Sequence, residues 1–315
     1  MEINKIYQES CLDTCKRIKD NSIDCVITSP PYWQLRDYGY EGQWGLEPTF
    51  QEYLGHLWNL MDEIYRILKS DGTVWINLGD SYSTQSGTNM ALSKGNYKKN
   101  NSTYLTNRGE SGNLIKDKSL PNKCLLLIPH RFAIGCIDRG WILRNDCIWA
   151  KRNGMPESVT DRFSKKHEYM FFMVKSEKYF FDLDAIRDKP QTGYDRIDAP
   201  NERKLLSGIK NNLNPIANNK LGKNPGDVSD FWDIPTKPSS SKHYATYNDS
   251  LLVKPILSGC PKNGIIYDPF MGTGSTGEAA LRSGRNFIGS EMSSEYINIA
   301  NKRLKPFLSQ LDLFK

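Results

Sequence analysis

The sequence predicts an α/β fold, and two patterns indicate it. Short apolar runs of strand length alternate along the 315 residues with longer segments whose apolar residues recur at helical spacing. Near residue 272, a glycine-rich turn stands between an apolar run and a helical pattern. That arrangement lets an α/β sheet hold a polar ligand at the end of a strand. The length suits one or two domains.

Composition indicates a cytoplasmic protein without a metal site. Hydrophobic residues make up 38% and charged residues 25% of the chain, and no apolar run approaches the length that spans a bilayer. The seven cysteines are scattered and odd in number, which favours free thiols over a disulfide framework. No cysteine or histidine cluster has metal-site spacing, and residues 1–5 lack the apolar core of a secretion signal. A net charge of +6 permits a polyanionic partner without demanding one.

Local signals place the first elements. Residues 24–28 form a short apolar run that we expect to be a buried strand. Thr49 and Glu52 make a capping box in front of a segment with helical spacing of apolar residues. We expect this helix to stop at Asp71-Gly72 and a strand to follow over residues 73–78.

Two stretches lack such periodicity. Residues 82–123 hold seven Lys or Arg against two acidic residues, and we expect a long mobile loop there. Residues 182–242 are rich in Pro, Asn and Lys, which fits either a linker or a small irregular recognition module. The adjacent aromatic residues Phe231-Trp232 favour the module, because they indicate packing. The remaining expected elements are a helix over 131–140, strands over 142–149 and 168–175, a helix over 250–257, a strand over 264–267, a helix ending near 284, a strand over 286–289 and a helix to about 304.

The turn at residues 268–276 indicates a cradle for a nucleotide-like cofactor. Gly272 and Gly274 are expected to let the backbone approach the ligand closely, because a Cβ at either position would collide with it. The turn lacks the lysine of a phosphate-binding P-loop, so ATP is disfavoured. Together with Gly277, the two glycines match part of the dinucleotide fingerprint, which leaves a nicotinamide oxidoreductase open.

Polar residues around this turn are candidate cofactor ligands. The strand over 264–267 runs directly into Asp268, the first residue of the turn. Ser275 and Thr276 can cap the following helix or donate to a carboxylate. Glu291 stands at the end of the next strand, where an acidic side chain can accept hydrogen bonds from both hydroxyls of a ribose.

Residues 28–33, Thr-Ser-Pro-Pro-Tyr-Trp, form a second motif at the end of a strand. The Ser29 hydroxyl and the Pro30 carbonyl can accept the two hydrogens of a planar amino group. Pro30 and Pro31 fix φ and so hold the carbonyls in one direction, and Tyr32 offers a ring face for stacking. A packed turn without function is the plain alternative, and the pairing with the glycine turn favours function.

The two motifs, in this order, resemble those of the permuted, or β-group, DNA amino-methyltransferases, which use S-adenosylmethionine. Residues 77–82, 129–133, 141–145 and 155–158 are also similar, so the resemblance covers most of the chain. It implies a seven-stranded Rossmann-like methyltransferase sheet with one antiparallel strand and a circularly permuted motif order. Residues 5–7 would supply the seventh strand.

The resemblance also implies contacts with the cofactor. Phe270 would pack on S-adenosylmethionine, and Tyr244 with Ala245 would close over its methionine end. Where family members often carry Gly-Asp near the adenine, this chain has Glu9-Ser10, so the aspartate that would contact the adenine is absent and Asp13 is a weak substitute for it.

The implied organisation has three parts. Residues 1–181 would be the catalytic half of the methyltransferase domain, with the loop of residues 82–123 inside it. Residues 182–242 would be a target-recognition region, and residues 243–315 the cofactor-binding half of the same domain.

The implied reaction moves a methyl group from S-adenosylmethionine to the exocyclic amine of a base flipped out of duplex DNA. A serine at the position of Ser29 is typical of enzymes acting on the 4-amino group of cytosine, and aspartate of those acting on the 6-amino group of adenine. Cytosine is therefore favoured, with adenine as the alternative. Methylation at carbon 5 of cytosine is disfavoured, because Cys260-Pro261 has the wrong order for its nucleophile.

The expected partner is double-stranded DNA. A second candidate partner is a cognate restriction endonuclease that acts separately in a restriction-modification system. We expect a bacterial or phage-encoded cytoplasmic protein, associated with the nucleoid, as a monomer or homodimer. Three other classes remain: an RNA or protein-glutamine methyltransferase, the oxidoreductase, and a DNA-binding module without catalysis. The intact motif at residues 29–32 argues against the last.

Overall fold

The chain forms a three-layer α/β structure around one mixed sheet. The computed structural model describes residues 1–39, 41–83, 120–154, 157–187, 229–236 and 249–312. In these ranges the sheet has eight strands in the order β1-β8-β7-β2-β3-β5-β4-β6. The strands in chain order are β1 (Lys5–Tyr7), β2 (Ile23–Thr28), β3 (Leu68–Leu78), β4 (Ile142–Ala150), β5 (His167–Val174), β6 (Phe231–Asp233), β7 (Ile265–Asp268) and β8 (Asn286–Ser290).

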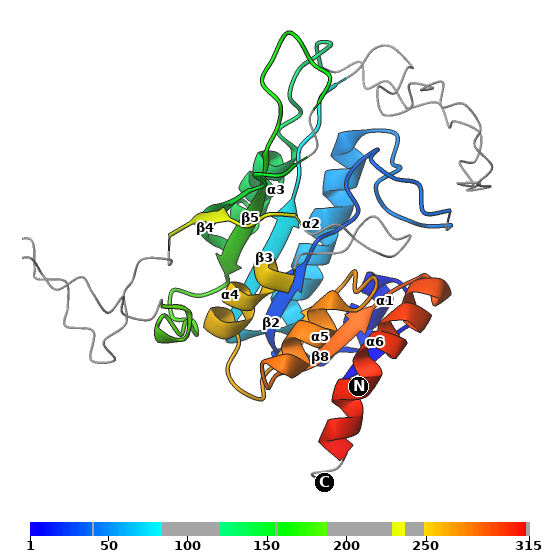
Figure 1. Ribbon diagram of the computed structural model, residues 1–315, viewed down its shortest axis with the longest axis vertical. Helices are drawn as coiled ribbons and strands as arrows, with labels where there is room; N and C mark the ends of the chain where they lie inside the picture. Colours follow the sequence, from blue (N-terminus) through cyan, green and yellow to red (C-terminus); the bar gives the residue numbers. More distant parts are fainter. Residues whose placement is uncertain (40, 84–119, 155–156, 188–228, 237–248, 313–315) are drawn as a thin grey trace, which may run out of the picture.

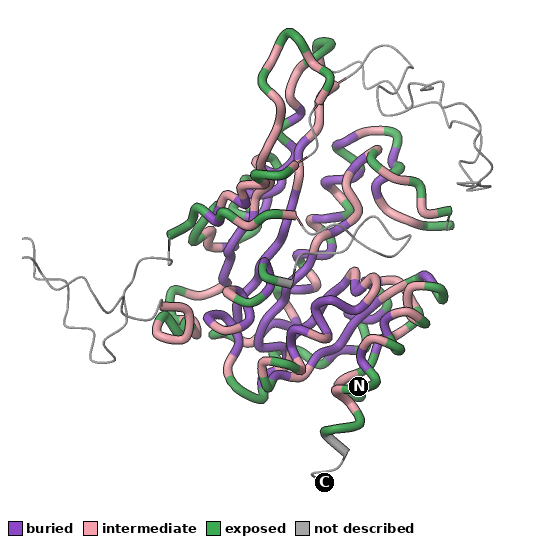
Figure 2. Tube along the Cα trace, in the orientation of Figure 1, coloured by how far each residue is buried: buried purple, intermediate pink, exposed green. Residues whose placement is uncertain are grey.

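Helices cover both faces of the sheet (Figure 1). They are α1 (Cys11–Arg17), α2 (Phe50–Ile67), α3 (Ile128–Ile137), α4 (Asp249–Gly259), α5 (Ser275–Arg282) and α6 (Ser294–Asp312), with a 3₁₀ turn η2 at Asp184–Ile186. One buried cluster joins α1, α2 and α3 to the sheet, and the other joins α4, α5 and α6 to it. Val74 and Ile76 of β3 belong to the first cluster and Trp75 to the second, as alternation along a strand requires. Figure 2 shows the central strands buried between these layers.

One strand runs against the others. β5 pairs antiparallel with β3 and β4, whereas the remaining pairings between described strands are parallel. This confirms the predicted α/β sheet with one antiparallel strand, and β1 is the strand expected at residues 5–7.

β6 adds an eighth strand that the sequence did not predict. Its three residues pair parallel with β4 at the edge of the sheet, and the Trp232 side chain is 4% exposed. The Trp232 ring lies 6.3 Å from that of Trp75, so packing against the sheet holds it. A strand of three residues has too little pattern to show a period.

The predicted end of the first long helix is wrong. α2 stops at Ile67, and Leu68 already has extended backbone angles, φ −69° and ψ 138°. Asp71 and Gly72 lie inside β3, where its pairing with β2 shifts register. The Asp-Gly pair therefore marks an irregularity within a strand rather than a helix end.

Parts of the two irregular stretches fall outside the described residues. The expected mobile loop is described only at its two ends, where Tyr82 bridges to Leu125. The expected recognition region is described only at residues 182–187 and 229–236. In the described ranges, no helix is long and apolar enough to cross a membrane. No group of three or more His, Cys, Asp or Glu side chains there could hold a metal ion, and all seven cysteines are free thiols.

Candidate active site

The two sequence motifs leave neighbouring strands at the same edge of the sheet. β2 and β7 pair in parallel, with Val26 opposite Tyr267, so their carboxyl ends lie side by side. The Thr28 hydroxyl donates a hydrogen bond of 2.7 Å to Asp268 Oδ1 across this boundary. Ligands of open α/β sheets bind outside the carboxyl ends of the strands.

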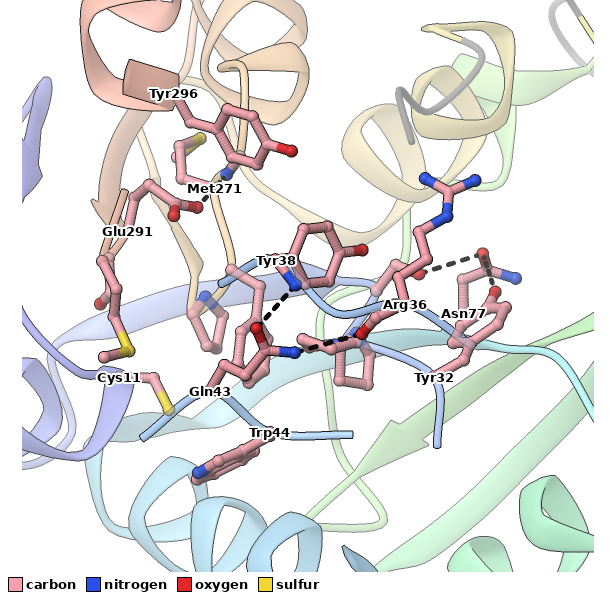
Figure 3. A pocket seen from close by; sticks show the side chains of 18 of the residues that line it. Cys11, Tyr32, Arg36, Tyr38, Gln43, Trp44, Asn77, Met271, Glu291 and Tyr296 are labelled. Atoms are coloured by element: carbon pink, nitrogen blue, oxygen red, sulfur yellow. Dashed lines mark hydrogen bonds between the residues drawn. The ribbon is translucent and has the colours of Figure 1, made fainter. Parts of the chain in front are cut away.

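A cavity of about 400 Å³ opens at this edge, and both motifs line it (Figure 3). The first motif contributes Ser29, Pro30, Pro31 and Tyr32, and the second contributes Pro269, Phe270, Met271, Gly272, Thr273 and Ser275. Glu291, at the end of β8, lines it as well. The segments expected to hold an amine and a cofactor therefore share one cavity.

Gly272 and Gly274 are both in the turn, but each position requires a glycine for a different structural reason. Gly272 has φ +54°, lines the cavity, and a Cβ built on it would meet no protein atom nearer than 3.9 Å. Gly274 has φ +84°, and its Cβ would come within 2.9 Å of Ala300 Cβ on α6. Gly274 does not line the cavity, and its lack of a side chain lets α5 pack against α6.

Asp268 and Thr276 lie beneath the turn and not in the cavity wall. Asp268 Oδ2 accepts a hydrogen bond of 2.6 Å from the Thr276 hydroxyl, and Oδ1 accepts one of 3.0 Å from the Phe270 N–H. Burial raises the pKa of the Asp268 carboxyl to about 6, although these hydrogen bonds oppose the increase. These side chains shape the turn from below.

Ser275 and Glu291 do reach the cavity. Ser275 is the first residue of α5, whose N-cap is Gly274 without a side-chain hydrogen bond, and Arg303 donates to the Ser275 hydroxyl at 2.8 Å. Glu291 accepts hydrogen bonds from the N–H groups of Gly272 (2.9 Å) and Ser293 (2.8 Å), one on each carboxylate oxygen. Burial raises the pKa of the Glu291 carboxyl. Each oxygen keeps lone-pair capacity for a ligand hydroxyl.

The other end of the cavity carries a polar network around Tyr32. The Tyr32 hydroxyl lies 2.8 Å from Glu168 Oε2 and 3.0 Å from Asn77 Oδ1. Asn77 Nδ2 donates to the Tyr169 carbonyl at 3.0 Å, which turns the amide oxygen towards Tyr32 and Ser29. The Ser29 hydroxyl lies 3.4 Å from that oxygen, which can accept its proton.

Backbone and ion-pair contacts hold this end in place. Tyr53, buried in α2, donates a hydrogen bond of 2.7 Å to the Pro31 carbonyl and so fixes the motif from behind. Lys151 forms an ion pair with Glu168, and its Nζ stands 4.2 Å from the centre of the Trp149 ring. The pair neutralises two charges that would otherwise face a partly buried cavity.

Sequence reasoning missed the wall formed by the segment after the first motif. Four of its side chains line the cavity: Arg36, Tyr38, Gln43 and Trp44 (Figure 3). Gln43 ties this segment together, because its Oε1 accepts from the Tyr38 N–H at 2.7 Å and its Nε2 donates to the Arg36 carbonyl at 3.1 Å. The Trp44 ring lies 5.4 Å from that of Phe270. The available signal was the aromatic content of this stretch between the proline motif and the capping box.

Met292 and Tyr296 also line the cavity without having been predicted. Glu9 and Ser10, the residues that replace the expected Gly-Asp, line it too. Glu9 forms an ion pair of 2.8 Å with Arg17, and Ser10 caps α1. Tyr244 and Ala245 lie outside the described residues.

The cavity fits an adenosine-bearing cofactor. The backbone at Gly272 leaves open space where another residue would carry a Cβ. Phe270 supplies an aromatic surface next to it, and Glu291 supplies a carboxylate that can bind hydroxyl groups. These residues suit the base and the ribose of S-adenosylmethionine.

Comparison with known proteins agrees with this geometry. The family model described as DNA methylase, which groups N6- and N4-methyltransferases, matches residues 23–302. The chain belongs to this family. The predicted resemblance is thereby confirmed. The protein is a DNA amino-methyltransferase, and its predicted cofactor, S-adenosylmethionine, is confirmed as well.

Relatives of the methyltransferase match over nearly its whole length. The Type II methyltransferase M.Cfr9I of Citrobacter freundii is 33% identical over 307 residues, which cover 97% of this chain and 89% of the relative. The Type II methyltransferase M.SmaI of Serratia marcescens is 33% identical over 300 residues, covering 95% and 90%.

Solved structures share the fold of the methyltransferase at low sequence identity. The cytosine-N4-specific PvuII DNA methyltransferase superimposes with a TM-score of 0.61 at 17% identity, covering 95% of this chain and 85% of that one. M1.HpyAVI in complex with S-adenosylmethionine gives a TM-score of 0.53 at 18% identity, covering 95% and 98%.

Proposed function

We propose that this methyltransferase acts on the 4-amino group of a cytosine flipped out of duplex DNA. The observation that carries the proposal is the hydroxyl of Ser29 at the wall of the cavity, with the Asn77 amide oxygen beside it as an acceptor for its proton. A neutral serine stands where adenine-specific relatives typically carry aspartate. The cytosine-N4 specificity named for the PvuII enzyme, which shares the fold, agrees with this choice.

The chemical difficulty is that an exocyclic amine is a poor nucleophile, because its lone pair is delocalised into the ring. With its own proton directed to Asn77, Ser29 Oγ can accept one amine hydrogen, and the Pro30 carbonyl can accept the other. Both acceptors then favour a tetrahedral nitrogen whose lone pair is free to attack. The hydrogen bond from Tyr53 to Pro31 fixes the backbone that presents them.

S-adenosylmethionine supplies an electrophilic sulfonium methyl group when it is bound. In our proposal, Glu291 holds the ribose hydroxyls, Phe270 packs on the base, and Gly272 lets the backbone approach. Asp268, Gly274 and Thr276 support the turn from behind the cavity wall. The methyl carbon would form a bond to the amine nitrogen as its bond to sulfur breaks, with S-adenosylhomocysteine as the leaving group. The methylated nitrogen would then carry a positive charge and lose one proton to solvent, because a conjugated amine is a weak base.

Duplex DNA must be distorted for this reaction. A base inside the helix cannot reach a cavity at the edge of a sheet, and flipping it out costs a few kcal/mol. We propose that residues 182–242 form the target-recognition region, flanked by a catalytic half over 1–181 and a cofactor-binding half over 243–315. The pairing of β1 with β8 and of β2 with β7 supports a single domain for the two halves.

The Type II names of the relatives support a place in a restriction-modification system. We propose that the enzyme works in the cytoplasm of a bacterium, at the nucleoid, as a monomer or homodimer beside a separate endonuclease.

Sequencing of modified DNA tests the substrate. The purified protein is incubated with S-adenosylmethionine and plasmid DNA, and modified bases are mapped by single-molecule sequencing. We expect N4-methylcytosine within one recognition sequence, and methylation that is slower by about 10²-fold or more with Ser29→Ala. N6-methyladenine at that sequence would show that the enzyme methylates adenine, the alternative substrate, and would contradict cytosine as the target. A gel shift that favours tRNA over duplex DNA would contradict DNA as the substrate.

A further inference from the structure

The connection between β4 and β5 carries an aromatic side chain that the protein does not cover. Phe163 is 96% exposed, the highest value for a large hydrophobic side chain in the described part of the chain. A phenylalanine in water forgoes the stabilisation that burial would give it. Its neighbours Ser164 and Lys165 are each partly covered, so Phe163 is not at the tip of a wholly solvated loop.

The backbone on both sides of Phe163 is held firmly. The Arg162 guanidinium donates to the Phe163 carbonyl at 3.0 Å and to Glu157 Oε2 at 2.6 Å, and it stacks 4.0 Å from the centre of the Tyr82 ring. Glu157 Oε2 also accepts from the Lys165 N–H at 3.4 Å. The connection therefore presents the Phe163 ring on a fixed support.

This connection begins and ends at the active site. It leaves β4 at Lys151 and returns to β5 before Glu168, and these two ion-paired residues line the cavity. The Lys151 N–H donates to the Lys166 carbonyl at 2.8 Å, so its two strands stay together above the cavity wall. In Figure 1 the connection extends beyond β4 and β5 at the carboxyl edge of the sheet.

The surroundings of Phe163 suit a polyanion. Residues 151–166 contain five Lys or Arg and two acidic residues. Both acidic residues are paired, Glu157 with Arg162 and Asp161 with Lys123 at 2.5 Å. Among the cations of the connection, Lys151 pairs with Glu168 and Arg152 with Asp233, so the excess of positive charge is small. A single aromatic ring among cations is unlike an apolar protein-docking patch, and it matches a surface that contacts phosphates and inserts between bases.

We propose that Phe163 inserts into the base stack of duplex DNA and fills the space left by the flipped target nucleotide. This inference rests on the proposed function, because only an enzyme that extrudes a base creates that gap. The ring would stack on the base pairs that flank the gap.

The test uses paired and mispaired targets in otherwise identical duplexes. The recognition sequence is first read from the sequencing map, and kcat/KM is measured for the wild-type protein and Phe163→Ala. On the paired duplex we expect a loss of between about five-fold and about 150-fold, the range that one base–aromatic stack supports. With the target base mispaired or opposite an abasic site, flipping is already favoured, and we expect the loss to shrink to within about two-fold. Phe163→Trp should retain the wild-type value on both.

Two further measurements separate the explanations. Ile134→Ala removes another exposed side chain (59%), on α3, and should leave kcat/KM unchanged on both the paired and the mispaired duplex. 2-Aminopurine placed at the target position should be less fluorescent with Phe163→Ala than with wild-type protein, since less of it is unstacked. Equal losses on paired and mispaired duplexes, or no loss on either, would overturn the insertion. If the wild-type protein methylates no duplex at all, it is the proposed function that fails.

Discussion

Thr28 and Asp268, which are 240 positions apart in the sequence, are joined by a hydrogen bond of 2.7 Å from the Thr28 hydroxyl to Asp268 Oδ1. Both atoms are buried, at the boundary between β2 and β7. Asp268 also accepts from Thr276 and from the Phe270 backbone. One carboxylate thus sets the amine motif and the cofactor turn in a fixed relation.

Removing this bond should destabilise the protein. Thr28→Val keeps the shape of the side chain but leaves a buried carboxylate with one donor fewer. We expect the free energy of unfolding to fall by about 1–3 kcal/mol, measured by urea denaturation. Thr28→Ser, which retains the hydroxyl, should recover most of the loss. A Thr28→Val protein as stable as the wild type would show that the bond contributes nothing.

Asp268 should also give the stability a characteristic pH dependence. Its pKa is raised from 3.8 to about 6 in the folded protein. The folded state therefore holds the proton more tightly, so this contribution is present below pH 4 and is lost as pH rises through 6. The full change is on the order of 3 kcal/mol.

The measurement is a comparison with Asp268→Asn, which cannot titrate. Subtracting the two profiles of unfolding free energy against pH cancels the other carboxyl groups. We expect the wild type to lose stability relative to the variant between pH 4 and pH 6. Parallel profiles over that interval would contradict a raised pKa at this position.

Gly272 and Gly274 should respond differently to the same substitution. Both have positive φ, so alanine at either costs about 1 kcal/mol of backbone strain. Gly274→Ala adds a close contact with Ala300 and should lower the unfolding free energy well beyond that. Gly272→Ala brings the Cβ no nearer than 3.9 Å to a protein atom and should instead weaken cofactor binding.

Thermal unfolding and calorimetric titration with S-adenosylhomocysteine separate these effects. Each variant serves as the control for the other, because the backbone strain is shared. A Gly272→Ala protein that binds the cofactor product as tightly as the wild type would place the ligand elsewhere in the cavity.

Substitutions at Ser29 and Glu291 should affect different quantities, turnover in the first case and cofactor affinity in the second. Ser29→Ala removes an acceptor that matters most when the amine becomes tetrahedral, so kcat should fall by about 10²-fold or more while cofactor affinity stays unchanged. Glu291→Ala should raise the dissociation constant for S-adenosylhomocysteine first, because it removes the proposed ribose partner. Single-turnover kinetics and calorimetry distinguish the two, and equal losses of affinity would contradict the division.

Tyr32 and Glu168 should be energetically coupled. Tyr32→Phe removes the hydroxyl that bridges to Glu168 and Asn77, and Glu168→Gln removes the charge that Lys151 neutralises. A double-mutant cycle on kcat/KM should give a coupling of about 0.5–3 kcal/mol, because the two side chains share one network. Strictly additive effects would mean that the hydroxyl and the carboxylate act independently.

Local signals in the sequence predicted most of the sheet and both motifs. Buried strands such as β2 have continuous apolar runs, and a glycine turn after a strand has a definite chemical meaning. Asp71-Gly72 misled the prediction because the same dipeptide serves a helix end and a strand irregularity, and only the pairing with β2 distinguishes them.

What the sequence could not supply was contact across long separations. Nothing near Gly274 shows that Ala300 of α6 will pack against it. The wall formed by Tyr38 and Trp44 depends on how residues 34–39 and 41–48 fold back over the cofactor turn, towards Phe270. Such contacts have no periodicity, so only coordinates reveal them.

The order of the strands affects how the protein can be made. β7 and β8, near the carboxyl terminus, lie between β1 and β2, which leave the ribosome first. Before the last strands emerge, β1 lacks its neighbour β8 and the cofactor turn does not exist. Closing contacts across almost the whole chain is slow and exposes apolar strand edges in the meantime. A nascent polypeptide therefore has no complete cofactor site, and no methyltransferase activity, until β7 and β8 have been synthesised.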